Sequence, residues 1–369
     1  MRHQATTDRL FLGLIIGLSL FGLLVLLSAS GPVSFQYYSD PLYFVRRQIL
    51  LGLLPGALLF LLVSRFDYRK LQALAFPALL ASVVLLILVF IPGIGLTKGG
   101  SASWIHLGGM SVQPSEFVKV AFLTYAAAWL ASRGEREGRT VEGGIAFLSA
   151  LGVVVLLLVL QPDTGSMSVI ALTTLLTYFA AGAPLSLFLG LLAAGAAGIA
   201  LLIKITPYRA ARFMTFMHPE LDPQGIGYHI NQAFLAIGSG GLFGLGYGQS
   251  RQKFLYLPEV QGDSIFAIMA EEWGFLVTIV FVAALGVLVW KCFKIAENAP
   301  DRFGRYLAIG AGVWIGVQAF VNIASMTGLM PMTGVTLPFV SYGNSSTVSL
   351  FAALGLVAAV QRRSSAPKL

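Results

Sequence analysis

Charged side chains are scarce in this sequence. Asp, Glu, Lys and Arg together make up 11% of the 369 residues, whereas a soluble domain carries about 25%. A chain with so few charges cannot cover its folded surface with polar groups, so most of that surface does not face water. Cysteine is scarcer still, because Cys292 stands alone and no intramolecular disulfide can form.

The basic residues lack the clustering that nucleic-acid binding requires. The formal net charge is +8, yet Lys and Arg are spread over short segments rather than gathered in one stripe. Between apolar runs they orient a membrane protein and contact anionic lipid headgroups. We therefore expect membrane lipid, and no nucleic acid, among the partners.

Long apolar runs dominate the rest of the chain. Hydrophobic residues make up 57% of it, and a bilayer-spanning helix needs about 20 in succession. The runs predict an all-α integral membrane protein of about ten transmembrane helices, a single polytopic domain over residues 1–369. The first run resembles a signal peptide, but its length favours a retained span. The predicted spans are 10–28, 48–64, 71–92, 114–132, 144–161, 165–181, 184–203, 263–290, 304–327 and 337–360.

The distribution of Lys and Arg predicts the orientation of these spans. Fifteen of the 24 lie at the two ends of the chain and in the loops near 65–70, 133–143 and 291–305. Cytoplasmic loops are richer in Lys and Arg, so both termini are expected to be cytoplasmic. The extracytoplasmic face then carries the segment near 93–113 and a large loop, 204–262, between spans seven and eight.

Ionisable residues interrupt three of the spans or their ends. A charge at bilayer depth costs roughly 2.5–3.5 kcal/mol, so each one needs a physical reason. Glu116 and Lys119 share one helix face, and they either form a structural ion pair or line a polar cavity. Asp163 lies in a sharp turn, where it suits a helix N-cap, a cavity position or both.

Asp263 stands at the mouth of the eighth predicted span. Glu271 and Glu272 follow about 12–13 Å deeper on other sides of the helix, so at least one is expected to pair with a neighbouring helix. Asp263 also suits a helix N-cap. It alone is placed where an extracytoplasmic reaction could reach it.

The large outer loop contributes cations and glycines. Arg209, Arg212 and Lys253 suit an anionic, phosphorylated, lipid-linked ligand, and contact with lipid headgroups is the alternative. Six glycines between positions 238 and 248 can aim backbone amides at an anion. Tight packing between a helix and a loop explains these glycines equally well.

The ordered motifs together resemble the SEDS family, the shape, elongation, division and sporulation proteins. The resemblance runs in family order through about 250 residues. Thr333 before Gly334 favours the RodA branch over FtsW, which more often has Lys there. The matching segments are Trp104-Ile105, Gln113–Glu116 with Lys119, Gln161–Gly165, Gly238–Gly241, Leu257–Glu259, Asp263 with Ile265–Ala267, Glu271–Gly274 and Pro331–Gly343.

This resemblance implies a peptidoglycan glycosyltransferase in the bacterial cytoplasmic (inner) membrane. Members of the family polymerise lipid II, a disaccharide-peptide on undecaprenyl pyrophosphate, into β-1,4 glycan strands with inversion. A RodA-like chain would do so during cell elongation. The implied partners are a class B penicillin-binding protein and the membrane proteins of the elongation complex.

The resemblance also assigns roles to single residues. Asp263 is implied as the base on the acceptor hydroxyl, and the three outer-loop cations as stabilisers of the pyrophosphate leaving group. A divalent cation, Mg²⁺ or Mn²⁺, held by Asp163 or Asp263, could share that task. The remaining residues expected to contact substrate or line the cavity are Trp104, Glu116, Lys119, Asp163 and Ser341.

Two departures from the family pattern lie close to this site. The usual His-Thr-Asp-Phe is Gln261-Gly262-Asp263-Ser264 here, so the histidine beside the aspartate is missing. The usual Ser-Tyr-Gly-Gly-Ser-Ser has Asn344 in place of its second glycine.

Two other functions compete with polymerisation. In a lipid II flippase, Glu116, Lys119 and Glu272 would mark a translocation path. In a noncatalytic scaffold, the chain would only support the penicillin-binding protein. The gathering of motifs on the outer face favours the polymerase.

Overall fold

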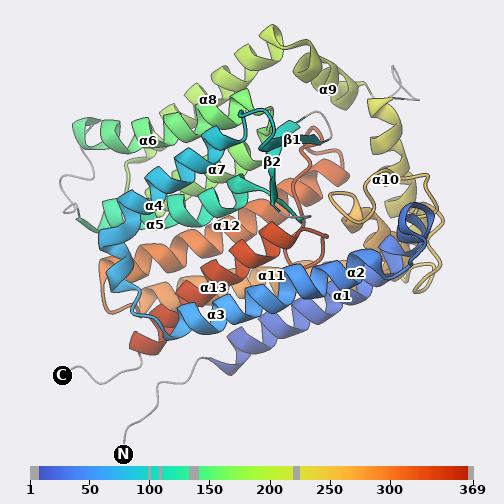
Figure 1. Cartoon of the computed structure of the whole chain (residues 1–369), viewed down its shortest axis with the longest axis horizontal. Helices are drawn as coiled ribbons and strands as arrows, with labels where there is room; N and C mark the ends of the chain where they lie inside the picture. Colours follow the sequence, from blue (N-terminus) through green and yellow to red (C-terminus); the bar gives the residue numbers. More distant parts are fainter. Residues whose placement is uncertain (1–7, 99–100, 108–109, 133–140, 219–224, 365–369) are drawn as a thin grey trace, which may run out of the picture.

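The computed structural model describes residues 8–98, 101–107, 110–132, 141–218 and 225–364 as a bundle of long helices (Figure 1). Short α2 (Tyr43–Arg47) and the π-helical turn η1 (Gln48–Leu53) lead without a break into α3 (Leu54–Arg65). The other long helices are α1 (Arg9–Tyr38), α4 (Arg69–Leu88), α5 (Pro114–Ser132), α6 (Val141–Leu160), α7 (Thr164–Ala180), α8 (Leu185–Ile205), α11 (Ile265–Glu297), α12 (Arg302–Met326) and α13 (Asn344–Ser364).

Each predicted span coincides with one of these helices, or with the continuous α2–η1–α3 segment. Within the described residues, seven helices are long and apolar enough to cross a membrane. Two more, α6 and α7, are apolar but shorter over their described lengths, and α5 carries Glu116 and Lys119. The protein is an all-α, multi-pass membrane protein, and the count of ten spans stays a prediction.

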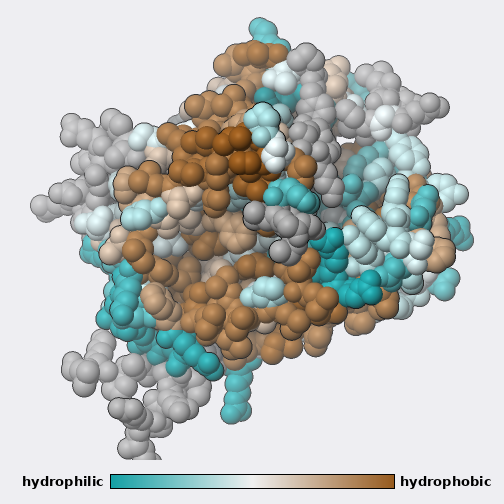
Figure 2. Space-filling model, viewed as in Figure 1, coloured by the Kyte–Doolittle hydropathy of each residue, from teal (hydrophilic) through white to brown (hydrophobic). Residues whose placement is uncertain are grey.

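The centre of the bundle is α12, which packs against α5, α7, α11 and α13. Its sequence is rich in Gly and Ala, so neighbouring helices approach closely, as is common in membrane bundles. At the other extreme, α8 has no buried residue and lies at the edge of the molecule (Figure 1). Figure 2 shows apolar surface over the helices and hydrophilic residues toward the two ends.

Segments predicted to be cytoplasmic meet at one end of the bundle (Figure 1). The Asp8 amide donates to Gln361 over 3.1 Å, and Lys291 pairs with Asp8 over 2.6 Å. Arg69 likewise pairs with Asp301 over 2.9 Å. The beginning of α1, the beginnings of α4 and α12 and the end of α13 therefore share one end, as the charge distribution predicts.

The opposite end contains structure that the apolar runs did not predict. An antiparallel sheet, β1 (Gly95–Lys98), β2 (Ser101–Leu107) and β3 (Met110–Val112) in the order β1-β2-β3, occupies the segment near 93–113. The outer loop 204–262 contains two helices, α9 (Pro207–Met217) and α10 (Ile226–Gly240). These short amphipathic or alternating segments give no long apolar run, which is why they were missed.

The last span begins later than predicted. A helix was expected from residue 337, but α13 starts at Asn344. Pro338 has no amide hydrogen to donate, and the amides of Leu337 and Tyr342 bond to other partners, Ser341 Oγ and the Gln261 carbonyl. Residues 331–343 therefore form an irregular segment, called here the 331–343 strap, at the end of the bundle that is predicted to face outward.

Close backbone packing explains two of the outer-loop glycines, Gly240 and Gly244. Gly244 lies against a kink in α11 at Gly274, where φ is +73°. A Cβ on Gly244 would stand 2.2 Å from the Glu272 carbonyl oxygen, and one on Gly274 would stand 2.2 Å from the Gly244 nitrogen. The Leu245 and Gly246 amides donate to the carbonyls of Glu271 and Glu272. These amides are committed to α11, so they do not form an anion-binding nest.

Candidate active site

Asp263 lies in a tight turn, Pro258–Ser264, directly before α11. The Gly262 amide donates to the Glu259 carbonyl over 2.8 Å, and Ser264 Oγ donates to the Pro258 carbonyl over 2.7 Å. Glu259 adopts a φ of +49°, an uncommon value for a residue with a side chain. The N-cap of α11 is Ser264, without a side-chain cap bond, so Asp263 does not serve as the helix cap.

The 331–343 strap and α12 hold this turn from one side. Ser341 Oγ donates to the Gly262 carbonyl over 2.7 Å, and the Tyr342 amide donates to the Gln261 carbonyl over 2.7 Å. Asn322 of α12 donates to the Asp263 carbonyl over 2.8 Å. Ser341 is itself buried, so its position suits support of the turn better than the substrate contact predicted for it.

The Asp263 carboxylate has fewer partners than a buried acid ordinarily has, although backbone hydrogen bonds at Asp263 and Ser264 act on it. Its Oδ1 atom is buried and forms no hydrogen bond with the described residues. Burial raises the pKa of Asp263 to about 7, the Glu259 charge adds to that increase, and Arg212 opposes it. A carboxyl group with this pKa can accept a proton and release it near neutral pH.

Helices α9 and α10 bring two further side chains to the turn. Arg212 of α9 donates to the Met332 carbonyl over 3.3 Å, and its charge acts on Asp263. His229 of α10 lies 2.6 Å from Ser264 Oγ, measured from Nε2. Arg212 was predicted from its charge. His229 was missed, because nothing in the sequence connects it to a residue 35 positions away.

Asp163 both caps a helix and joins two helices. Its Oδ1 accepts from the Ser166 amide over 3.0 Å at the start of α7. Its Oδ2 accepts from Gln113 over 3.3 Å and from Ser115 over 3.2 Å, at the start of α5. The sequence left two roles open for Asp163, a helix N-cap and a position in a cavity. The bond from the Ser166 amide shows that it caps α7.

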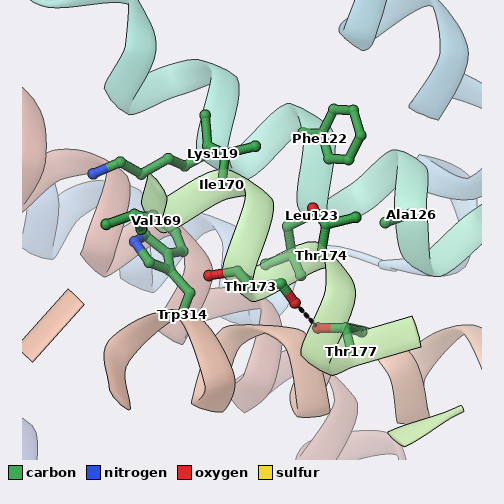
Figure 3. A pocket seen from close by; sticks show the side chains of 10 residues that line it. All are labelled: Lys119, Phe122, Leu123, Ala126, Val169, Ile170, Thr173, Thr174, Thr177 and Trp314. Carbon is green, nitrogen blue, oxygen red and sulfur yellow. Dashed lines mark hydrogen bonds between the residues drawn. The ribbon is translucent and has the colours of Figure 1, made fainter. Parts of the chain in front are cut away.

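Glu116 and Lys119 form a buried ion pair in the helix bundle. The pair spans 2.8 Å, Lys119 also donates to Gln318 over 3.0 Å, and Ser349 donates to Glu116 over 3.2 Å. Lys119 borders a cavity of about 20 Å³ among α5, α7 and α12 (Figure 3). That volume suits about one water molecule, so the pair is mainly structural and borders a very small cavity with a mostly apolar lining.

Asp263, Asp163 and the Glu116–Lys119 pair all lie close to the 331–343 strap, each through its own contacts. Asp263 approaches Gly334, whose ideal Cβ would lie 3.9 Å from its Oδ2. Asp163 adjoins Gly165, whose ideal Cβ would lie 2.6 Å from the Thr333 carbonyl oxygen. Lys119 reaches Thr336 through Gln318, which donates to the Thr336 carbonyl over 3.0 Å. All three groups therefore adjoin the same segment, the 331–343 strap.

Two of the predicted pyrophosphate cations lie elsewhere. Lys253 is buried in an ion pair with Glu272 over 2.8 Å and donates to Ser28 over 2.9 Å. Arg209 donates to the Val159 carbonyl over 2.9 Å and to Thr206 over 3.1 Å. The roles predicted for Lys253 and Arg209 are therefore not supported by their positions. All three residues are cations in the same loop, so nothing in the sequence distinguishes Lys253 and Arg209 from Arg212.

The roles expected of Trp104 and of a metal site stay predictions. Trp104 lies on β2, paired with Leu96 of β1, and no described contact joins it to Asp263. Among the described residues, no group of three or more His, Cys, Asp and Glu is arranged to hold a metal ion. The carboxylate whose charge acts on Asp263 is Glu259, rather than Asp163.

Comparison with known proteins places this arrangement in a family. The family sequence model of the FtsW/RodA/SpoVE cell cycle proteins matches residues 8–366 of this chain. The chain belongs to this family, the SEDS proteins. It is 39% identical to stage V sporulation protein E of Bacillus subtilis, over 99% of this chain and 100% of that protein. It is also 39% identical to a probable peptidoglycan glycosyltransferase FtsW of Trichlorobacter lovleyi, over 94% and 91%.

Solved SEDS structures share the fold. A chain of a peptidoglycan synthase complex that coordinates polymerization and crosslinking superimposes with a TM-score of 0.80 at 29% identity, over 97% of this chain and 98% of that one. RodA of Thermus thermophilus gives a TM-score of 0.71 at 30% identity, over 97% of both chains. These relatives carry SpoVE, FtsW and RodA names, so the RodA branch indicated by Thr333 stays a prediction.

Proposed function

We propose that this SEDS chain is a peptidoglycan glycosyltransferase that polymerises lipid II on the outer face of the bacterial cytoplasmic membrane. The activity class follows from the family and from relatives named as peptidoglycan glycosyltransferases. The residue assignment rests on one observation. Asp263 has a buried oxygen without a described hydrogen-bond partner and a pKa raised to about 7.

In the proposed reaction, Asp263 accepts the proton of the 4-hydroxyl of the acceptor GlcNAc. The hydroxyl oxygen forms a bond to the anomeric carbon of the donor MurNAc from the face opposite the leaving group. The bond from that carbon to pyrophosphate breaks, and undecaprenyl pyrophosphate departs with the electron pair. One displacement of an α-linked donor gives the β-1,4 product, and a positioned base contributes about 10²–10⁴-fold to such a step.

Arg212 is the cation best placed to balance the charge that develops on the pyrophosphate. It lies on α9 beside the Asp263 turn, and its charge acts on that carboxylate. Fixed cations aimed at developing charge stabilise the transition state without reorganisation. Its bond to the Met332 carbonyl ties α9 to the strap.

A divalent cation fits this site through a different acid from the one predicted. Mg²⁺ is commonly held by one or two carboxylates together with substrate phosphates. Exposed Glu259 could hold the ion beside the Asp263 turn and leave Asp263 free as the base, whereas Asp163 is already bonded to Gln113, Ser115 and Ser166. When bound, Mg²⁺ or Mn²⁺ would neutralise pyrophosphate charge.

An apolar groove provides space for a polyprenyl chain. Side chains of α3, α4, α5 and α13 line it, around a volume of about 300 Å³. Its lining is almost entirely apolar side chains, such as Val63, Leu74 and Phe117. Such a groove suits the undecaprenyl tail of lipid II, which gains stability from burial against apolar walls.

A class B penicillin-binding protein is the proposed partner. The structural match to a synthase complex that joins polymerization to crosslinking supports it. Assignment to an elongation complex depends on the RodA branch and rests on Thr333 alone.

The experiment is polymerisation of labelled lipid II by purified protein, alone and with its partner, followed by gel separation of glycan strands. Wild-type protein is expected to form strands and Asp263→Ala to lose at least about 100-fold of the rate. Asp40→Ala is the matched control, because Asp40 is an outer-face aspartate that pairs with Arg46 outside this site. Its rate should stay within about twofold of wild type.

The same assay separates the competing functions. Full polymerisation by Asp263→Ala would refute the base assignment. No strands from wild-type protein under any condition would refute the glycosyltransferase. Movement of labelled lipid II across vesicle membranes would then identify a flippase, and its absence would leave the scaffold.

A further inference from the structure

A chain of hydrogen bonds links α10 to the residue that follows Asp263. His229 Nε2 lies 2.6 Å from Ser264 Oγ, and Ser264 Oγ donates to the Pro258 carbonyl over 2.7 Å. A serine hydroxyl has one hydrogen, and here the Pro258 carbonyl receives it. His229 must therefore donate from Nε2, which fixes the tautomer with its proton on that nitrogen.

His229 keeps this state across the neutral pH range. Burial lowers its pKa to about 4, and the Arg212 charge lowers it further. The imidazole is therefore uncharged when Asp263 is ionised. It adds a donor to the turn without adding a second cation next to Arg212.

Asp263 depends on its backbone for orientation, because its carboxylate has few anchors of its own. The strap and α12 hold Gly262 and the Asp263 carbonyl from one side. On the α10 side, the recorded side-chain contact to the turn is that of His229 with Ser264. Without it, the turn would be anchored on one side and free to shift on the other.

We propose that His229 is a positioning residue for Asp263, which it holds in place by donating to Ser264. This inference rests on the proposed glycosyltransferase function. The Ser264 hydroxyl lets a histidine from another helix support the turn that carries Asp263.

An ordinary packing histidine is the competing explanation, and the two differ in what they alter. A packing residue affects stability and leaves the rate per folded molecule unchanged. A positioning residue affects the chemical step, because a displacement of about 1 Å can cost about 10²-fold in rate. Substrate binding depends on other groups, so KM should change little.

The test compares four variants in the lipid II polymerisation assay, with kcat and KM measured separately and folding followed by thermal unfolding in detergent. His229→Ala is expected to lower kcat about tenfold or more, with KM within about twofold. His229→Gln, which retains a donor of similar reach, should recover most of that loss. Ser264→Ala, which loses the bond to the Pro258 carbonyl as well, should be at least as slow as His229→Ala, and the double variant should be no slower than Ser264→Ala.

His218→Ala is the matched control, because His218 is an exposed histidine at the end of α9 in the same outer loop. Its kcat should equal that of wild type. The proposal is overturned if His229→Ala keeps a wild-type kcat, if Gln gives no recovery, or if the losses of the two single variants multiply. If His229→Ala fails to fold, Ser264→Ala alone decides through its kcat. Inactive wild-type protein would refute the proposed function itself, a result separate from these.

Discussion

Glu272 and Asp263 are both buried or partly buried acids near the start of α11, yet their surroundings are opposite. Glu272 accepts bonds from Lys253, Ser28 and the Ser250 amide. Asp263 has an Oδ1 atom with no hydrogen bond among the described residues. The Oε1 atom of Glu272, which already accepts three hydrogen bonds, is committed to holding the structure together. A carboxylate with an open position can receive a proton from a substrate.

Two lysines and one arginine also differ in how deeply they are buried. Lys119 and Lys253 each form an ion pair with a glutamate and are almost fully buried. Arg212 is only half-buried, and its charge acts on Asp263. The paired lysines stabilise the bundle, and the arginine remains close enough to interact with an anionic substrate.

The largest expected effect tests the structural side of this comparison. Lys253→Met should leave Glu272 as an uncompensated buried charge and cost about 3–5 kcal/mol of unfolding free energy. Denaturant or thermal unfolding in detergent measures it. Lys253→Met combined with Glu272→Gln should recover part of the loss. Equal stability of the single and double variants would contradict the pairing.

Lys294→Met is the matched control for that experiment. Lys294 pairs with Glu297 over 2.8 Å, but both side chains are about half exposed. Exposed pairs contribute at most about 1 kcal/mol. A loss comparable to that of Lys253→Met would show that burial does not separate the two pairs.

The next effect tests the open carboxylate through pH. A base must be ionised, and the pKa of Asp263 is raised to about 7. We expect kcat/KM for lipid II to fall about tenfold for each pH unit below about 7 and to level off above it. A profile that is flat from pH 5 to 8 would contradict Asp263 as the base.

The raised pKa of Asp263 also predicts how the stability of the protein changes with pH. An unfolded aspartate has a pKa of about 4, so the folded state binds its proton more tightly. The stabilisation is complete below about pH 4 and is lost as pH rises through about 7. Asp263→Asn should therefore raise the melting temperature at pH 8 relative to wild type, with a much smaller difference at pH 4.

The sequence predicted the helices well because long apolar runs follow from one physical requirement, the thickness of the bilayer. The Glu116–Lys119 pair was one of two alternatives that the sequence allowed, since residues three apart on a helix share a face and can meet regardless of the rest of the fold. Asp263 was identified by its place at a helix mouth and by family resemblance. Such local or repetitive patterns need no knowledge of tertiary contacts.

The remaining site depended on contacts between distant segments. Lys253 carries the same charge as Arg212, and only the packing of the outer loop against α11 buries it beside Glu272. Ser341 contacts Gly262 across 79 positions, and His229 contacts Ser264 across 35. These partners follow from how the strap and α10 pack on the turn, which no local pattern encodes.

The smallest expected effect separates the two arginines of α9. Arg212 lowers the pKa of Asp263, while burial and Glu259 raise it. Removing that charge in Arg212→Gln should raise the pKa further and move the acidic limb of the pH profile to higher pH, with a loss of about tenfold or more in kcat. Arg209→Gln is the matched control, because Arg209 bonds to Thr206 and the Val159 carbonyl. Its acidic limb should not move. Equal shifts in the two variants would mean that the general charge of α9, rather than the position of Arg212, sets the state of the base.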